Sequence, residues 1–296
     1  MIKVVVLGSA GAVPGVERGL PAVGIRFGGN VYLFDCGEGT QRQMMRFGLS
    51  YAKVKCIFLS HSHADHIIGI AGLAQTLDLI GRKEPLSIYC PKGCGRQVDA
   101  LLSIGRYGYE VSVNEIGEGF THRGEGFSVS AFSVPHTCTS LGYAFQQDGR
   151  RNFDEKKCRK LGISGRMFGE LEKNGVIPVG GKKISYASVS KAKKGVKIVY
   201  SGDCLPNQAL AAQAKGADLL IHEATYGSDH EKEAAEKMHS TAAQAAAIAK
   251  KAGVKRLVLT HISGRYGENA MLEEEARKVF KNSEVAEDGK EMLLPE

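Results

Sequence analysis

The sequence predicts an α/β fold, and three observations carry that prediction. Strand-like and helix-like patterns alternate along most of the 296 residues, which is typical of sheets covered by helices. Three separate segments share one pattern: an apolar strand begins with a valine, and a polar residue follows the end of the strand. Thirty-seven glycines and no tryptophan favour many tight turns. We expect a single domain over residues 1–296.

Short runs rich in valine, isoleucine, leucine and phenylalanine predict strands, and longer segments with apolar residues three or four apart predict helices. In the first half, strands are expected at 4–7, 23–26, 31–35, 54–59, 86–90, 111–115, 129–134 and 142–146, and helices at 40–47, 65–80 and 95–104. In the second half, strands are expected at 196–200, 219–222, 257–260, 284–286 and 292–294, and helices at 208–215, 241–251 and 269–281. Gly253 is well placed to end the alanine-rich helix.

Residues 147–181 break this alternation, because they are polar, basic and rich in glycine. We interpret them as a protruding insertion without a core of its own. Between residues 146 and 197 there are 14 Lys or Arg residues against five Asp or Glu residues, whereas the whole chain has a net charge of +7. A basic surface is most often simply solvated, but a basic excess confined to one insertion indicates contact with nucleic-acid phosphates.

Composition excludes several classes of protein. With 43% hydrophobic and 24% charged residues, the chain is neither disordered nor of low complexity. No stretch reaches the roughly 18 apolar residues that cross a bilayer, and the N-terminus lacks the apolar core of a signal peptide. Seven scattered cysteines favour reduced thiols. We expect a soluble, cytoplasmic protein without membrane contact.

The strongest chemical signal is the segment His61-Ser62-His63-Ala64-Asp65-His66. It places three imidazoles and one carboxylate within six residues, directly after an apolar strand. Imidazole nitrogen and carboxylate oxygen are ligands that zinc or manganese accepts. A solvated polar turn is the alternative, but histidines packed this densely would repel one another when protonated.

Spacing extends this set of ligands. The segments 54–61, 196–203 and 254–261 each run from a valine through a strand to a metal-binding side chain. If these strands are neighbours in one sheet, the three side chains meet at one edge. A histidine after residues 132–135 adds another ligand. The set is His61, His63, Asp65, His66, His136, Asp203 and His261. Seven ligands are too many for one tetrahedral zinc, whereas two metals bridged by a carboxylate would use them all.

The pattern His61-x-His63-x-Asp65-His66, with a lone later histidine, Gly202-Asp203 and a last histidine, resembles the metallo-β-lactamase superfamily. Finer motifs resemble ribonuclease Z over nearly the whole chain. They are Phe34-Asp35-Cys36-Gly37-Glu38-Gly39-Thr40-Gln41, His222-Glu223-Ala224-Thr225, His239-Ser240-Thr241 and Thr260-His261-Ile262-Ser263-Gly264-Arg265-Tyr266.

The resemblance implies an αββα sandwich with a flexible arm, the insertion at 147–181. It implies two zinc ions per subunit, with manganese as the alternative metal. One ion would be held by His61, His63 and His136 and the other by Asp65, His66 and His261, with Asp203 bridging.

The resemblance also implies catalytic roles. Asp65 would be the general base, and His239, held by Glu223, would donate a proton to the leaving oxygen. From the residues alone, Glu223 could be a surface carboxylate, and His239 could merely precede a helix. Ser263 and Arg265 are expected to contact phosphate, although Arg265 could equally pair with an acidic neighbour.

The implied activity is that of a hydrolase, an endoribonuclease that trims the 3′ trailer from precursor tRNA. The products would be a tRNA with a 3′-hydroxyl and a trailer with a 5′-phosphate, and the short family form is a homodimer. The arm would grip the tRNA, with Arg166 among the residues that contact it. In its segment 161–169, Arg166 stands where the family has proline, and near the N-terminus Gly19 stands where asparagine is usual.

Two other functions remain open on the sequence. One is a phosphodiesterase or sulfatase of the same superfamily that acts on small molecules, but such a substrate needs no remote basic arm. The other is a non-catalytic RNA-binding protein, which would gain nothing from a complete set of seven metal ligands.

Overall fold

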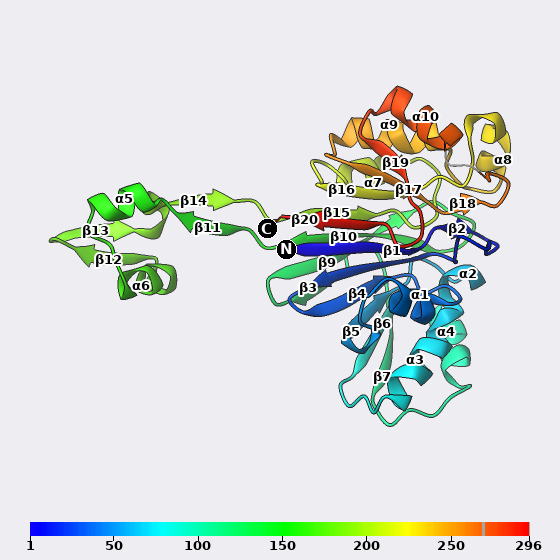
Figure 1. The fold of residues 1–296 in the computed structure, drawn as a ribbon, viewed down its shortest axis with the longest axis horizontal. Coiled ribbons are helices and arrows are strands. Elements are labelled where there is room, and N and C mark those ends of the chain that lie inside the picture. The colour runs from blue at the N-terminus through cyan, green and yellow to red at the C-terminus, as the bar shows by residue number, and fades with distance from the viewer. Residues whose placement is uncertain (268–269, 296) are drawn as a thin grey trace. The chain divides into compact units, whose positions relative to one another are not determined.

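The computed structural model describes residues 1–267 and 270–295. Its contacts divide the chain into two units, one formed by residues 1–146 with 197–296 and the other by residues 147–196. The larger unit contains two seven-stranded sheets, and Figure 1 shows helices α1 to α4 over one sheet and α7 to α10 over the other. The predicted αββα sandwich is therefore confirmed. Within the described residues, no helix is long and apolar enough to cross a membrane.

The first sheet is built mainly from the N-terminal half. Its order is β20 (Glu291–Leu294), β1 (Ile2–Gly8), β3 (Ala22–Phe27), β4 (Asn30–Phe34), β5 (Val54–Phe58), β6 (Leu86–Pro91) and β7 (Val111–Ile116). The strands from β4 to β7 are parallel. The helices of this half are α1 (Thr40–Arg46), α2 (Ala64–Ile67), α3 (Gly69–Leu79) and α4 (Gly95–Leu102).

The second sheet is built mainly from the C-terminal half. Its order is β19 (Ser283–Val285), β17 (Leu257–Thr260), β16 (Leu219–Glu223), β15 (Lys197–Tyr200), β10 (Ser140–Gln147), β9 (Phe127–Val134) and β8 (Thr121–Gly124). The strands β15, β16, β17 and β19 are parallel. The helices of this half are α7 (Gln208–Gln213), α8 (Glu231–Glu236), α9 (Ala242–Ala252) and α10 (Ala270–Val279).

Aromatic rings fill the space between the two sheets. Tyr143 of the second sheet packs against Phe34 and Phe58 of the first, with ring centroids 5.8 and 5.6 Å apart. Tyr32 and Phe127 pack in the same way at 4.6 Å. Because such rings bury large apolar areas, they fix the two sheets face to face and align the edges from which the site is built.

In the larger unit, the structure differs from the sequence prediction at one helix and at several short elements. The helix expected at 65–80 divides between α2 and α3, because the Gly69 amide donates to the Cys36 carbonyl at 2.9 Å instead of continuing the helix. A side chain at position 69 would collide with the Gly37 backbone. The short strands β2 (Ala10–Gly11), β8 and β18 (Ile262–Ser263) and the helix α8 were not expected. The predicted start of the last helix, residue 269, lies outside the described residues.

The smaller unit has a hydrophobic core of its own, so the expectation of an insertion without a core is wrong. It contains β11 (Arg150–Phe153) paired with β14 (Ser190–Lys193), β12 (Val176–Val179) paired with β13 (Lys182–Ser185), α5 (Glu155–Lys160) and α6 (Arg166–Asn174). Its buried side chains are Cys158, Ile163, Leu171, Ile177 and Val189. The unit extends to residue 196, beyond the predicted arm at 147–181, because β14 returns alongside β11.

Candidate metal centre

The site lies where several parallel strands end. His61 follows β5, Asp203 follows β15 and His261 follows β17, and β15 and β17 flank β16 in parallel register. His136 follows β9 of the same sheet. Carboxyl ends of neighbouring parallel strands meet at one edge, where open α/β sheets bind ligands. Asp203 and His261 therefore meet at one edge of the second sheet. The expectation that all three strands share one sheet is wrong, because β5 belongs to the first sheet. His61 joins the group because the two sheets pack face to face.

Three imidazoles form the first group of ligand atoms. The distance from His61 Nε2 to His63 Nδ1 is 2.9 Å, and the distance from His136 Nε2 to His63 Nδ1 is 3.4 Å. Burial and the neighbouring His66 lower the pKa of His61 well below its usual value, and burial also lowers the pKa of His63 and of His136. All three rings are therefore neutral, the form in which histidine binds a metal.

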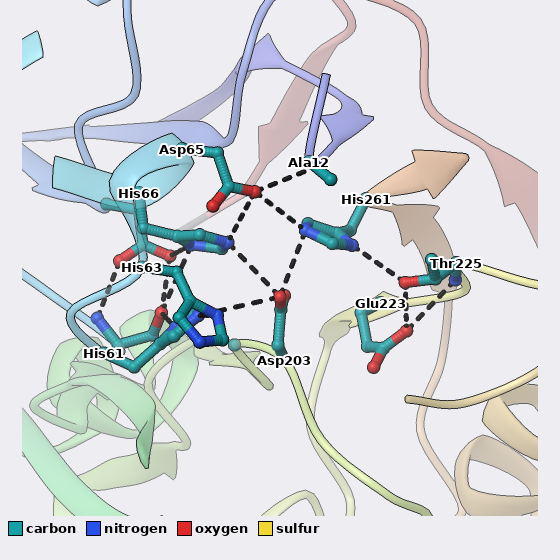
Figure 2. A network of polar contacts seen from close by, with 12 residues as sticks. Ala12, His61, His63, Asp65, His66, Asp203, Glu223, Thr225 and His261 are labelled. Atoms are coloured by element: carbon teal, nitrogen blue, oxygen red, sulfur yellow. Dashed lines mark hydrogen bonds and ion pairs between the residues drawn. The ribbon is translucent and has the colours of Figure 1, made fainter. Parts of the chain in front are cut away.

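The second group shares one carboxylate oxygen with the first. Asp203 Oδ2 lies 3.3 Å from His66 Nε2 and 3.1 Å from His261 Nε2. Asp65 Oδ2 lies 3.5 and 3.4 Å from the same two nitrogens. On the other side, Asp203 Oδ2 lies 3.8 Å from His61 Nε2. Figure 2 shows Asp203 between the two groups.

The donor atoms fit a divalent cation. His66 Nε2 and His261 Nε2 are buried, and neither has a hydrogen-bond partner among the residues that the structure describes. Burial lowers the pKa of His66, but the carboxylates of Asp203 and Asp35 outweigh it and raise the pKa well above its usual value. The negative charge of these carboxylates therefore favours a positive charge close to His66. A cation bound by imidazole and carboxylate ligands provides that charge.

A buried carboxylate orients the ligands from behind. Asp35 accepts hydrogen bonds from the Ser60 amide at 2.6 Å, the Ser60 hydroxyl at 2.8 Å, His66 Nδ1 at 2.8 Å and the Tyr200 hydroxyl at 2.6 Å. The Ser60 oxygen is in turn 2.9 Å from His61 Nδ1. Such partners fix the tautomer and orientation of metal-binding histidines. The sequence motif contained Asp35, but no signal in the sequence pointed to Ser60 or Tyr200.

Glu223 is not a surface carboxylate, since only 1% of it is exposed. It accepts hydrogen bonds from the amides of Cys204, Thr225 and Ser240 at 3.0–3.1 Å. It also accepts from the Thr225 hydroxyl at 2.8 Å and from His239 Nδ1 at 2.9 Å. Both oxygens accept hydrogen bonds from these donors, and one of the donors is the ring of His239.

His239 is held as a cation. Burial lowers its pKa, but the charge and hydrogen bond of Glu223 more than offset burial and raise the pKa to about 9. Burial raises the pKa of Glu223, and the His239 charge and hydrogen bond lower it overall. Nδ1 faces the carboxylate, so Nε2 is the ring nitrogen that can give up a proton.

The residues expected to bind substrate lie in different settings. Arg265 forms two hydrogen bonds of 2.8 and 2.9 Å with Glu233 and stacks over the Tyr226 ring at 4.9 Å, so it pairs with an acidic neighbour. Ser263 is partly exposed in β18, two residues beyond His261. Arg166 is exposed at the start of α6 in the smaller unit.

Comparisons with known proteins agree with this geometry. The β-lactamase superfamily domain matches residues 30–153 and 171–262. Ribonuclease Z of Methanothermobacter thermautotrophicus is 40% identical over 97% of this chain and 95% of its own length, and that of Gemmatimonas aurantiaca is 43% identical over 97% and 94%.

Solved structures show the same fold. The short form of human tRNase Z is 28% identical, with a TM-score of 0.72 over 99% of both chains. A metallo-β-lactamase fold protein of Bacillus subtilis, 21% identical over 98% of both chains, shares the fold with a TM-score of 0.73. On its fold, its site and these identities, the chain belongs to the ribonuclease Z family of the β-lactamase superfamily.

Proposed function

We propose that the chain removes the 3′ trailer from precursor tRNA, with two divalent cations at the site and with a 3′-hydroxyl on the tRNA and a 5′-phosphate on the trailer as products. The endoribonuclease activity follows from membership of the ribonuclease Z family. One observation supports the two-metal mechanism above all. Seven ligand residues converge as two groups that share Asp203 Oδ2.

The ligand groups assign the cations. His61, His63 and His136 would hold one, Asp65, His66 and His261 would hold the other, and Asp203 would contact both. Imidazole and carboxylate ligands favour zinc and also suit manganese. The cations would activate a water molecule and bind oxygens of the scissile phosphate.

Two side chains would move protons. Asp65 Oδ2 lies beside the cation position and accepts a hydrogen bond from the Ala12 amide at 3.0 Å. The other carboxylate oxygen, Oδ1, can therefore accept a proton as general base. His239 would donate from Nε2 to the leaving 3′-oxygen of the tRNA. Glu223 keeps the imidazole oriented and charged for this step.

The basic smaller unit would be the tRNA-binding arm on a single catalytic domain. Its Lys and Arg side chains are carried on a folded scaffold, as the exposed residues Lys156, Arg159 and Lys160 of α5 illustrate. Arg166, Ser263 and Arg265 would contact phosphate. Arg265 is paired with Glu233 in the structure. To contact a phosphate, it would have to leave Glu233.

The protein would act as a cytoplasmic homodimer. Exposed apolar side chains on the larger unit support self-association, among them Met45, Ile68, Leu79 and Ile80 around α1 and α3. The cysteines are all free thiols, which fits a reducing compartment.

Cleavage of a 3′-extended precursor tRNA in the presence of zinc or manganese tests the function. Mapping both new ends should locate the cut after the discriminator base, with the termini given above. Asp203→Ala should abolish cleavage. An uncut tRNA, together with hydrolysis of a small chromogenic phosphodiester, would reassign the substrate, and loss of both activities would argue for a non-catalytic RNA-binding protein.

A further inference from the structure

We infer that Thr225 is a positioning residue that couples the metal ligand His261 to the proton donor His239 through the Glu223 carboxylate. This inference rests on the proposed two-metal mechanism and deepens it. Thr225 is 6% exposed and lies just beyond the end of β16. Its hydroxyl contacts Glu223, His239 and His261, and it acts through these two histidines.

The Thr225 hydroxyl has three polar neighbours and one proton to give. Its oxygen lies 2.8 Å from Glu223 Oε2, 2.8 Å from His261 Nδ1 and 3.2 Å from His239 Nδ1. An ionised carboxylate can only accept, so the hydroxyl donates to Glu223. His261 Nδ1 must then carry a proton and donate it to the hydroxyl oxygen.

This hydrogen bond sets the tautomer of His261. With the proton on Nδ1, the lone pair of a neutral ring is on Nε2, which faces Asp203 Oδ2 at 3.1 Å and Asp65 Oδ2 at 3.4 Å. The ring is confined from another side as well. A side chain at position 11 would come within 2.6 Å of His261 Nδ1, so only glycine allows this approach of the backbone.

The two oxygens of the Glu223 carboxylate are linked to different histidines. His239 Nδ1 bonds to Glu223 Oε1, and Thr225 bonds to Glu223 Oε2 through both its amide and its hydroxyl. Figure 2 shows the path from Glu223 through Thr225 to His261. Outer partners of metal-bound histidines raise their basicity and change metal affinity about 10–100-fold. Through Thr225, the negative charge of Glu223 therefore acts on the ring of His261. The same carboxylate is hydrogen-bonded to the proton donor His239.

Three variants test this coupling. Thr225→Val keeps the shape and removes the hydroxyl, Thr225→Ser keeps the hydroxyl, and Thr260→Val is the matched control. Thr260 is also buried on the strand leading to the site, but its hydroxyl has no partner among the described residues. Zinc stoichiometry and affinity are measured by competition with a chelator, and kcat and KM are measured on precursor tRNA at saturating zinc.

Thr225→Val should bind one of its two zinc ions about 10–100-fold more weakly and show a lower kcat with an unchanged KM for tRNA. Thr225→Ser should restore both quantities, and Thr260→Val should match the parent. Equal loss in the valine and serine variants, or parental zinc affinity in Thr225→Val, would overturn the inference. If far-UV circular dichroism shows that Thr225→Val is unfolded, Thr225→Ala is read in the same way. A parent protein that binds fewer than two ions, or that leaves tRNA uncut, would overturn the proposed function instead.

Discussion

The Tyr200 hydroxyl donates a 2.6 Å hydrogen bond to Asp35 Oδ2, which joins the two sheets beneath the metal centre. Tyr200 ends β15 of one sheet, and Asp35 follows β4 of the other. Asp35 is fully buried and has a backbone φ of 60°, a conformation that costs a non-glycine residue energy. The same carboxylate oxygen holds His66 Nδ1 at 2.8 Å, so packing of the sheets and orientation of a ligand depend on one group.

Replacing Tyr200 with phenylalanine should lower both stability and zinc affinity. A hydrogen bond to a charged group contributes about 1.5–3 kcal/mol, and urea unfolding measures that loss. Tyr143→Phe is the control, because its buried hydroxyl also bridges the sheets, to the Leu59 carbonyl at 2.6 Å, without contacting Asp35. Tyr143→Phe should lose stability but keep zinc affinity. Equal zinc affinity in the two variants would contradict the role of Tyr200.

Removing metal should destabilise the protein as well as inactivate it. Asp203 and Asp65 face each other across His66 and His261, and a cation satisfies both carboxylates. A ligand present at about 1,000 times its Kd stabilises the folded state by about 4 kcal/mol. Treatment with a chelator should therefore lower the Tm, and zinc should restore both Tm and cleavage. An unchanged Tm would show that the centre is not loaded in the protein as prepared.

The pH profile of cleavage should report the pairing of Glu223 with His239. A proton donor must be protonated, and the pKa of His239 is raised to about 9. Activity at saturating substrate should therefore fall as the pH rises through about 9. Glu223→Gln removes the charge that raises this pKa, so the alkaline limb should move to lower pH. An alkaline limb that stays in place in Glu223→Gln would assign it to another group.

The sequence predicted the candidate metal ligands that the structure brings together, but it did not predict the residues that orient them. His61, Asp203 and His261 each follow an apolar strand. Asp203 and His261 meet at the edge of one parallel sheet, whereas His61 comes from the other sheet, and only the packing of the two sheets brings it close. Thr225 and Tyr200 act through single hydroxyl groups. His261, which Thr225 contacts, is 36 residues away in the chain, and Asp35, which Tyr200 contacts, is 165 residues away. No periodicity encodes such contacts. The core of the arm was missed because its buried residues, such as Leu171 and Val189, are isolated between polar or charged neighbours in the sequence.

The arm should be removable without loss of the catalytic unit. Gln146 and Lys197 are paired in the antiparallel register of β10 and β15, so an Asn-Gly turn can replace residues 147–196 and close a hairpin. This variant should lose most of its kcat/KM on precursor tRNA and keep hydrolysis of a small phosphodiester. A variant with intact circular dichroism that loses both activities equally would show that residues 147–196 are needed for the chemistry.

Arg166→Pro should stabilise the arm, because Arg166 is the first residue of α6. Proline is favoured at this position, where the backbone N–H has no partner within the helix. A residue before proline must be extended. Gly165 has φ 54° and ψ −123°, the mirror image of that conformation. Glycine adopts both forms equally well, so proline can follow Gly165 without a change of backbone. Proline should add about 0.4–1 kcal/mol by restricting the unfolded chain, which slower hydrogen exchange of the α6 amides measures.

The matched variant Arg166→Ala removes the arginine charge without adding a proline ring, so it distinguishes the effects of the two changes. It should leave amide exchange in α6 near that of the parent. If Arg166 contacts a tRNA phosphate, both variants should reduce the slope of log affinity against log salt concentration by about 0.9 or less. An unchanged slope would place Arg166 off the tRNA, and faster exchange in Arg166→Pro would show that the start of α6 does not tolerate the proline ring.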